Sequence, residues 1–427
     1  MGDQKPSGRL HPWSFWSLGA APIALFFLLV LMRPVIDTTW HWKNTGFGVS
    51  PLQIVGLLLP VFLLWALWRR HEGLIPLLRS NAEVLSWLLL SLFSGLALLI
   101  ASMGADTAGM LVKFILPALF IVFGMLYLRE IPVLDRLAMV MALSVVVPLL
   151  FVLYEVVFGP MSLSTRSGVL RYSGPYAQVS VYGIHFSMGL LGVAYLYLRS
   201  RTNALFLMLL VVMSILALAI PWVVHMTTWA VIGGLFAVLV FAMLWRKEWL
   251  RVAVFVAVPV VVLFLSFSMR SSEDYARIVA PDIGVIRGDA PPEYFGNSRG
   301  LIWKNYLQQY AGAPVYAQLF GMPFSGEENM SGTTFGAHND FLRILMATGV
   351  LGLLLYLVWL GRSIVAVLKL RGELLFLGVG ALIIWLGFSV GLTPTYIVPF
   401  STVILPILGG LSEIARKERK ATTAYTE

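Results

Sequence analysis

The stretch T-F-G-A-H-N-D-F-L-R-I-L at residues 334–345 carries a polar segment straight into an apolar one. The polar segment extends back to about residue 269 and includes N-S-R-G-L-I-W-K-N-Y at residues 297–306. A connection of more than about 12–15 residues without regular structure is usually functional or disordered. Because this one holds arginines, aromatic side chains and a histidine, we predict that it carries the function and that the rest of the chain presents it.

The composition of the chain is that of a protein dissolved in lipid. Of its 427 residues, 59% are hydrophobic and only 12% are charged, whereas soluble domains have about 25% charged residues. We therefore predict an all-α polytopic membrane protein. The absence of cysteine excludes disulfides, thiolate metal ligands and a thiol nucleophile. The net charge of +9 reports topology in such a protein rather than a nucleic-acid partner.

About twelve segments are apolar over roughly 20 residues, the length that crosses the hydrocarbon core of a bilayer. They lie at residues 15–32, 51–68, 84–103, 109–128, 137–158, 179–198, 204–223, 227–245, 252–269, 341–360, 374–392 and 396–411. The predicted organisation is transmembrane helices with short loops at 1–269, one long, partly helical loop at 270–340, transmembrane helices at 341–411, and a basic tail at 412–427.

Lysine and arginine residues in the short loops predict the orientation. The basic loops fall on one side of the predicted helices, at residues 5–9, 69–79, 129–136, 199–201, 246–251, 362–371 and 416–420. The opposite turns at 104–108 and 223–226 carry no Lys or Arg. By the positive-inside rule the basic side, both termini and the tail are cytoplasmic. The long loop is then on the outer face, which is periplasmic for the inner membrane of a Gram-negative bacterium.

Topology gives no reason for arginine in the outer loops, yet Arg166 and Arg171 lie in the short loop at 162–177. A long translocated domain carries charge freely, but this loop is short, so a bound anion is an alternative to a solvated surface. Lys113 and Glu155 fall within predicted spans and are functional candidates for that reason. Lys113 is also close enough to the outer boundary to extend its amine into it.

His338 stands just before a predicted helix N-terminus, at the membrane–water boundary. Asn339 or Asp340 is a good N-cap for the helix that follows. Arg343 is spaced to form an ion pair with Asp340. Two roles are open for the histidine: it can hydrogen-bond the loop as an interfacial residue, or act as a general base in a cleft between the loop and the helices.

Residues 298–312 are predicted to form a short amphipathic helix capped by Ser298. Arg299 falls in its first turn, where a cation opposes the helix dipole unless an anion or a carboxylate is near. We therefore expect a bound anion there, or pairing with a loop carboxylate such as Glu293. Trp303, one turn later, is either a packing or interface anchor or a platform for a sugar.

The remaining chemistry is narrow. The chain contains no D-x-D, H-E-x-x-H or G-x-x-x-x-G-K-[ST], so metal-bound sugar nucleotides, zinc hydrolysis and P-loop ATP use have no support in the sequence. Arginine stabilises a departing diphosphate well, and histidine takes a proton from an incoming hydroxyl near pH 7. A basic outer cleft with a histidine therefore suits attack on a lipid-diphosphate-linked sugar at the outer leaflet.

Three motifs stand in order on the predicted outer side. They are R-Y-S-G-P-Y at 171–176, S-R-G-L-I-W at 298–303 followed by L-F-G-M-P at 319–323, and H-N-D-F-L-R-I-L-M-A-T-G-V-L-G-L at 338–353. These resemble the R-x-x-G-x-(aromatic), S-R-x-x-x-W…G-x-G and H-N-x-(aromatic)-L…G-x-x-G motifs of the O-antigen ligase and polymerase family. The motif order, the span count and the long outer loop match as well, so the resemblance covers most of the chain.

The resemblance implies a GT-C-like glycosyltransferase. An O-antigen ligase of this kind moves the O-antigen glycan from undecaprenyl diphosphate to a sugar hydroxyl of lipid A–core, in the outer leaflet of the inner membrane. It implies that His338 activates the acceptor as a base, with inversion at the anomeric carbon. We expect no metal, no cofactor and no nucleic-acid partner, and a monomer among membrane lipids. The residues implied to bind diphosphate or glycan are Arg171 and Arg299, then Arg166 and Arg343, and also Asn339, Trp303 and Tyr176.

Three alternatives stay open at this point. An O-antigen polymerase or a protein O-oligosaccharyltransferase would use the same lipid-linked donor with a different acceptor. The compact outer loop, without a second soluble domain, favours the ligase. A polysaccharide transporter or flippase would use the arginines as an anion path, but transporter sites lie near the membrane midplane, whereas these candidates lie near one face.

Overall fold

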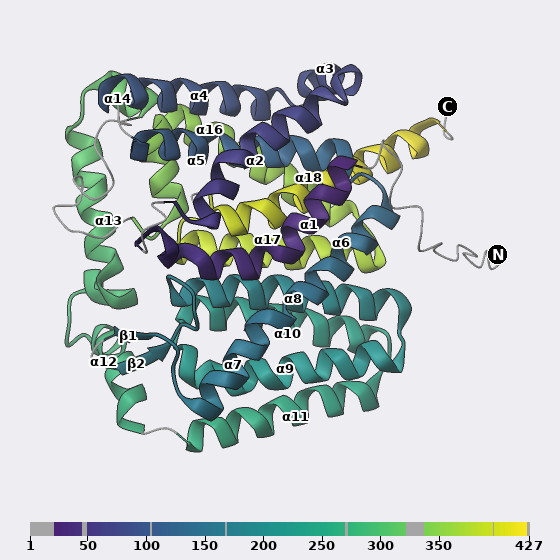
Figure 1. Cartoon of the computed structure of the whole chain (residues 1–427), viewed down its shortest axis with the longest axis vertical. Coiled ribbons are helices and arrows are strands. Elements are labelled where there is room, and N and C mark those ends of the chain that lie inside the picture. Colours follow the sequence, from purple (N-terminus) through teal and green to yellow (C-terminus); the bar gives the residue numbers. More distant parts are fainter. Residues whose placement is uncertain are drawn as a thin grey trace.

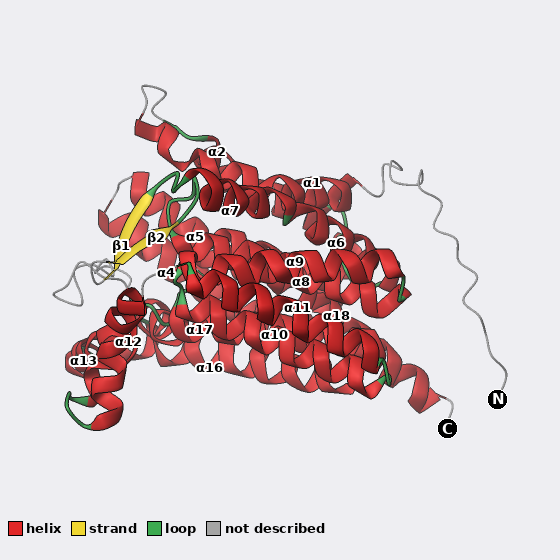
Figure 2. Ribbon diagram, turned by 90° about the horizontal axis from the view of Figure 1, so that it is seen from below, coloured by secondary structure: helices red, strands yellow, loops and turns green. Residues whose placement is uncertain are grey.

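The computed structural model describes residues 21–44, 49–102, 105–166, 169–269, 272–321, 337–395 and 397–424. Within these ranges the chain is almost entirely helical (Figures 1 and 2). Ten of the described helices are long and apolar enough to cross a membrane. The count is eleven if the bent pair α3 (His71–Ser80) and α4 (Ala82–Ser102) forms one span. The prediction of an all-α polytopic membrane protein is confirmed.

The predicted spans correspond to helices one by one, with two differences. The predicted span 109–128 is the helix α5, whose described apolar part, Leu111–Tyr127, is shorter than the others, so the count falls below the predicted twelve. The predicted span 137–158 is divided near residue 145. In chain order, the helices that match the predicted spans are α1 (Ala21–Ile36), α2 (Pro51–Trp68), α4, α5 (Ala105–Tyr127), α6 (Ile131–Ser144) with α7 (Val146–Phe158), α8 (Val179–Ser200), α9 (Asn203–Val223), α10 (Met226–Trp245), α11 (Trp249–Ser268), α16 (Asp340–Lys369), α17 (Gly372–Gly391) and α18 (Val398–Ala424).

Helix α8 lies at the centre of the bundle. Of the residues in its apolar window, 94% are buried inside the protein, and it packs against α6, α9, α10 and α17. Most helices on the outside instead present leucine, valine and phenylalanine outward, as α11 does with Phe264 at 73% exposure. A helix that is apolar all round belongs inside a bundle or against lipid, and this chain uses both solutions.

Apart from α3, the elements that do not correspond to predicted spans gather at one end of the bundle (Figures 1 and 2). They are the antiparallel pair β1 (Leu163–Arg166) and β2 (Val169–Tyr172), the 3-10 helices η3 (Asp37–Asn44) and η4 (Pro292–Tyr294), and the helices α12 (Ser272–Arg287), α13 (Phe295–Gly312) and α14 (Val315–Phe320). Between α11 and α16 the described part of the predicted long loop is thus largely helical.

The basic turns lie at the opposite end. Arg246, after the last residue of α10, binds Glu373 at 2.6 Å, and Arg362, far along α16, binds Glu83 at 2.6 Å. The segment predicted as a basic tail continues as helix α18 through its described residues, and Arg416 there pairs with Glu413 at 2.5 Å. The hairpin and α13 therefore occupy the end of the bundle that is poor in these basic turns.

A buried carboxylate ties the β-hairpin to the bundle. Glu155, near the end of α7, is fully buried. Its oxygens accept hydrogen bonds from the backbone amides of Gly174 and Met161 at 3.0 Å each, and from the Tyr182 hydroxyl at 3.0 Å. Both ends of the segment 161–174 are therefore fixed to one side chain. The functional candidate Glu155 is explained by this structural task.

We predict that Glu155→Ala lowers the free energy of unfolding by about 3 kcal/mol, because each buried donor left unsatisfied costs about 1–3 kcal/mol. Glu155→Gln, which keeps one acceptor oxygen, should lose less. Thermal unfolding in detergent measures both, with Glu72→Ala on the exposed face of α3 as the matched control. A Glu155→Ala protein that melts with the control would contradict this account of the hairpin.

Candidate functional site

The loop that contains His338 is held in place from two sides. Asn339 is the N-cap of α16, and its side chain accepts a hydrogen bond from the amide of Leu342 at 3.0 Å. The indole nitrogen of Trp303, on α13, donates to the carbonyl of Ala337 at 3.0 Å. The predicted cap at Asn339 is confirmed, and the polar end of Trp303 serves as an anchor. His338 lies between these two fixed points and is half-buried.

Of the five described non-glycine residues with positive φ, two lie in the basic turns and three lie at the end that holds the candidate site. His338 has a φ of +48°, Ser298 a φ of +64° and Val224 a φ of +45°. Residues other than glycine seldom take this left-handed conformation, and for a β-branched side chain it is a genuine outlier. Such strain costs about 1–3 kcal/mol per residue and is concentrated at functional sites. Here it occurs at the candidate base, beside the candidate Arg299, and in the turn between α9 and α10.

Arg299 reaches from α13 to the ends of two bundle helices. A Cβ built on Gly391, the last residue of α17, would lie 3.0 Å from Nη1 of Arg299 and 2.3 Å from Oγ1 of Thr227. The guanidinium therefore occupies space that exists because residue 391 has no side chain. Thr227 is in the first turn of α10.

The start of α13 differs from the prediction. The helix begins at Phe295 rather than after a cap at Ser298, and both Gly296 and Ser298 have positive φ in its first turn. Glu293, the loop carboxylate considered for Arg299, forms an ion pair with Lys304 at 3.0 Å. The first turn is therefore irregular, and Arg299 leaves it toward the bundle.

The β-hairpin approaches the same turn between α9 and α10. Tyr172 stacks on Trp222, with ring centroids 5.1 Å apart, and Val169 packs against Val224 in a small buried cluster. Arg171 pairs with Ser164 across the hairpin and shares the strand face of Val169, because side chains alternate along a strand. Arg171 thus shares the strand face of Val169, which packs on Val224, and Arg299 and Thr227 both lie against Gly391 nearby. The side chain of Arg166 lies outside the described residues.

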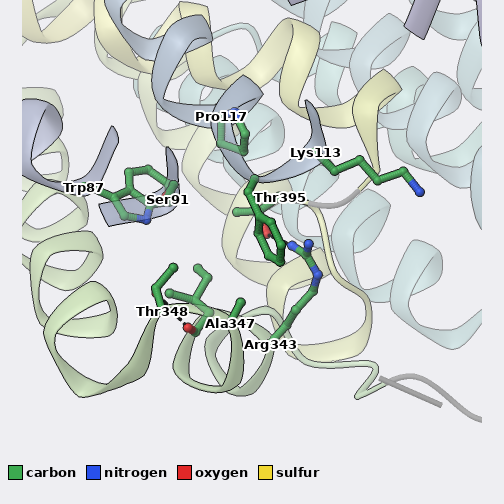
Figure 3. Close-up of a pocket in the computed structure, with 10 residues that line it drawn as sticks. Trp87, Ser91, Lys113, Pro117, Arg343, Ala347, Thr348 and Thr395 are labelled. Atoms are coloured by element: carbon green, nitrogen blue, oxygen red, sulfur yellow. Dashed lines mark hydrogen bonds between the residues drawn. The ribbon is translucent and has the colours of Figure 1, made fainter. Parts of the chain in front are cut away.

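Arg343 is buried beside a narrow notch between α4, α5 and α16 (Figure 3). It is 4% exposed, lies over the Phe114 ring at 5.5 Å, and donates through Nη1 to the Thr395 hydroxyl at 2.8 Å. The free space in the notch is about 10 Å³, the room that a single water needs. Lys113 also lines it, with its amine pointing away from Thr395 (Figure 3). This place suits a structural role for Arg343 better than contact with a sugar.

Tyr176 is also a core residue. It is 1% exposed, and its ring centroid lies 5.0 Å from that of Tyr182 and 5.6 Å from that of His185. Burial, and then the nearby Asp37 carboxylate, raise the pKa of Tyr176, so its hydroxyl stays protonated. Tyr176 therefore packs between the hairpin and the bundle core rather than lining the surface that a substrate would meet.

Gly321 and Gly349 come from two different motifs, and each packs against the backbone of the segment that contains the other. Gly349, where α16 has a kink, has a φ of +67°, and a Cβ there would lie 2.2 Å from the carbonyl oxygen of Leu319. Gly321 has a φ of +97°, and a Cβ there would lie 2.3 Å from the carbonyl oxygen of Ala347. These glycines allow α14 to press against the kink, so their motif positions have a packing explanation.

The sequence did not single out several residues that hold this end together. Thr227 and Thr395 carry no signal, because their partners are distant in sequence. The buried cluster of Arg33, Asp37 and His185 did have a sequence signal, because Arg33 and Asp37 are charged residues four apart at the end of an apolar segment. Asp37 lies 2.8 Å from Arg33 and 3.0 Å from His185. Close by, Trp40 donates to the Pro175 carbonyl at 3.1 Å, which ties η3 to the hairpin.

Two comparisons with known proteins found no match for the chain. No protein-family model matches the chain, and no curated protein matches it.

We predict that Gly391→Ala costs about 1–3 kcal/mol of stability, the usual effect of overpacking, because the new methyl group must displace Thr227 and Arg299. Gly361→Ala is the matched control, since a Cβ there meets nothing within 4 Å and alanine favours a helix by about 1 kcal/mol. Thermal unfolding in detergent compares the two. Equal melting temperatures would contradict the close contact between Gly391 and the Arg299 side chain.

Proposed function

We propose that this protein is a GT-C-like membrane glycosyltransferase that transfers an O-antigen glycan from undecaprenyl diphosphate to a sugar hydroxyl of lipid A–core. The observation that carries the proposal is the grouping of His338, Arg299 and the Arg171 hairpin at one end of an apolar bundle. The hairpin packs on Val224 just before α10, Arg299 and Thr227 at the start of α10 both lie against Gly391, and Trp303 of α13 donates a hydrogen bond to the residue before His338.

The basic turns support an outward-facing site. Arg199, Arg246 and Arg362 lie toward the far ends of helices that begin near the candidate site. Basic residues are retained on the cytoplasmic side of a membrane, so the candidate site faces outward, toward the periplasm. A lipid-linked donor in the outer leaflet would then reach the site from the bilayer itself.

The chemistry requires one base and an anchor for the leaving group. His338 takes the proton from the acceptor hydroxyl, whose oxygen attacks the anomeric carbon of the donor sugar as the bond to the diphosphate oxygen breaks. The electron pair of that bond leaves with the lipid diphosphate, whose charge Arg171 and Arg299 stabilise through paired N–H donors. A single displacement inverts the anomeric configuration.

The experiment is a reconstituted transfer with purified protein and undecaprenyl-diphosphate-linked glycan, offered lipid A–core and a pilin as acceptors in parallel reactions, followed by gel analysis of the products. Glycan attached to lipid A–core supports the proposal. Longer lipid-linked glycan without attachment indicates a polymerase, and transfer only to a pilin serine indicates a protein glycosyltransferase. Absence of all three products contradicts glycosyl transfer by this chain.

Within that assay, we predict that His338→Ala reduces turnover by about 10²–10⁴-fold, the usual contribution of general-base catalysis, with normal expression and a normal melting temperature. His71→Ala, an exposed histidine on α3, controls for the general effect of removing an imidazole. Full turnover in His338→Ala would remove this side chain from the mechanism.

A further inference from the structure

We infer that Thr395 is a positioning residue that locks the start of α16, and with it His338, to the turn between α17 and α18. The catalytic part of this inference rests on the proposed function; the structural part does not. Thr395 lies in the connection between Gly391 and Val398 and is 3% exposed. It is 55 residues from its partner Asp340, so the contact exists only in the folded bundle.

Three buried side chains form one short chain of hydrogen bonds. The Thr395 hydroxyl donates to Oδ1 of Asp340 at 2.6 Å, and its backbone amide donates to the same oxygen at 3.1 Å. Nη1 of Arg343 donates to the Thr395 hydroxyl at 2.8 Å. An arginine has no acceptor, and a hydroxyl has one proton. The direction of both bonds is therefore fixed, and the hydroxyl stands between a carboxylate and a guanidinium.

Because this contact is buried, its loss should cost more free energy than the loss of an exposed hydrogen bond. Asp340 is 0% and Arg343 is 4% exposed. In an apolar interior a hydrogen bond to a charged group is stronger than in water, and a charged group that loses its partner is costly. The hydroxyl also connects Asp340 and Arg343, the two residues that the sequence predicted to form an ion pair. Without it, the first turn of α16 keeps only the Thr395 amide from this group of bonds.

The contact controls the relative position of the two candidate functional groups. Asp340 is the first residue of α16, Asn339 caps it, and His338 comes directly before the cap. The same connection begins at Gly391, against which the Arg299 guanidinium lies. One short segment, 391–395, therefore touches both the element that carries the base and the arginine assigned to the diphosphate. Loss of the Thr395 contact should allow these two to move apart.

The test compares Thr395→Val, which replaces the hydroxyl by a methyl group of similar size, with Thr395→Ser, which keeps it. In Thr395→Val we expect kcat to fall about tenfold to a hundredfold, since a displacement near 1 Å can cost 10²-fold. The KM for the lipid-linked donor should change little, because donor binding itself is retained. Thr395→Ser should restore kcat.

The matched control is Thr348→Val. Thr348 lines the same notch and is 3% exposed, but its hydroxyl donates to Ile344 in its own helix at 2.8 Å. The second measurement, independent of activity, is hydrogen exchange of the amides at 339–343. It should be faster in Thr395→Val and unchanged in Thr395→Ser and Thr348→Val.

The outcomes separate the two proposals. Wild-type exchange in Thr395→Val overturns the positioning role, whatever the activity. An equal loss of kcat in Thr348→Val also overturns it, because any buried hydroxyl would then serve. If exchange is faster in Thr395→Val but the wild-type protein shows no glycosyl transfer, the positioning role of Thr395 is supported and only the proposed function is refuted.

Discussion

Charged and polar groups enclosed in an apolar bundle must find their partners within the protein, and this constraint organises the end of the molecule that carries the candidate site. Two buried carboxylates meet it in the same way. Glu155 collects amides from the connection between α7 and α8, and Asp340 collects the amide and hydroxyl of Thr395 from the connection between α17 and α18. Each carboxylate thereby fixes a non-helical segment that would otherwise leave unsatisfied backbone groups in the bundle.

The two fixed segments carry or touch the candidate functional residues. The first continues into the hairpin of Arg171, and the second borders both Arg299 and the start of α16. The bundle is therefore more than a membrane anchor in this account. Its buried hydrogen bonds fix the segments that carry or border the candidate base and the two candidate anion-binding arginines, which come from different parts of the chain.

The quoted motifs contain residues of two kinds. Gly174, Gly321 and Gly349 all have positive φ and close contacts that a side chain would fill, so packing explains them. His338 and Arg299 differ from these glycines in their chemistry, because an imidazole can accept a proton near pH 7 and a guanidinium can bind an anion. His338 even occupies a strained backbone conformation. Of the motif residues, the histidine and the arginines are therefore the ones on which the proposed chemistry rests.

Sequence patterns predicted the parts of this structure that depend on local chemistry. The apolar segments follow from length and composition, and the cap at Asn339 follows from its amide side chain before a helix. The cap at Ser298 was wrong: α13 begins at Phe295, and Ser298 has a positive φ that its local sequence did not reveal. Thr227 and Thr395 could not be ranked, because their partners come from elements far away in sequence, whereas the spacing of Arg33 and Asp37 was a signal that was not used. Glu155 was recognised as unusual, but its task depends on the hairpin that it binds.

The central claim, that α13 places Arg299 at the outward end of α10, is open to a direct measurement because the chain contains no cysteine. One variant carries cysteines at Arg299 and Thr227, and another carries them at Arg299 and Trp245. These two positions on α10 are roughly 27 Å apart along the helix. A short, membrane-impermeant bifunctional thiol reagent is added to spheroplasts. The account predicts cross-linking of the 299–227 pair only; cross-linking of the 299–245 pair, or reaction at residue 299 only from the cytoplasmic side, would contradict it.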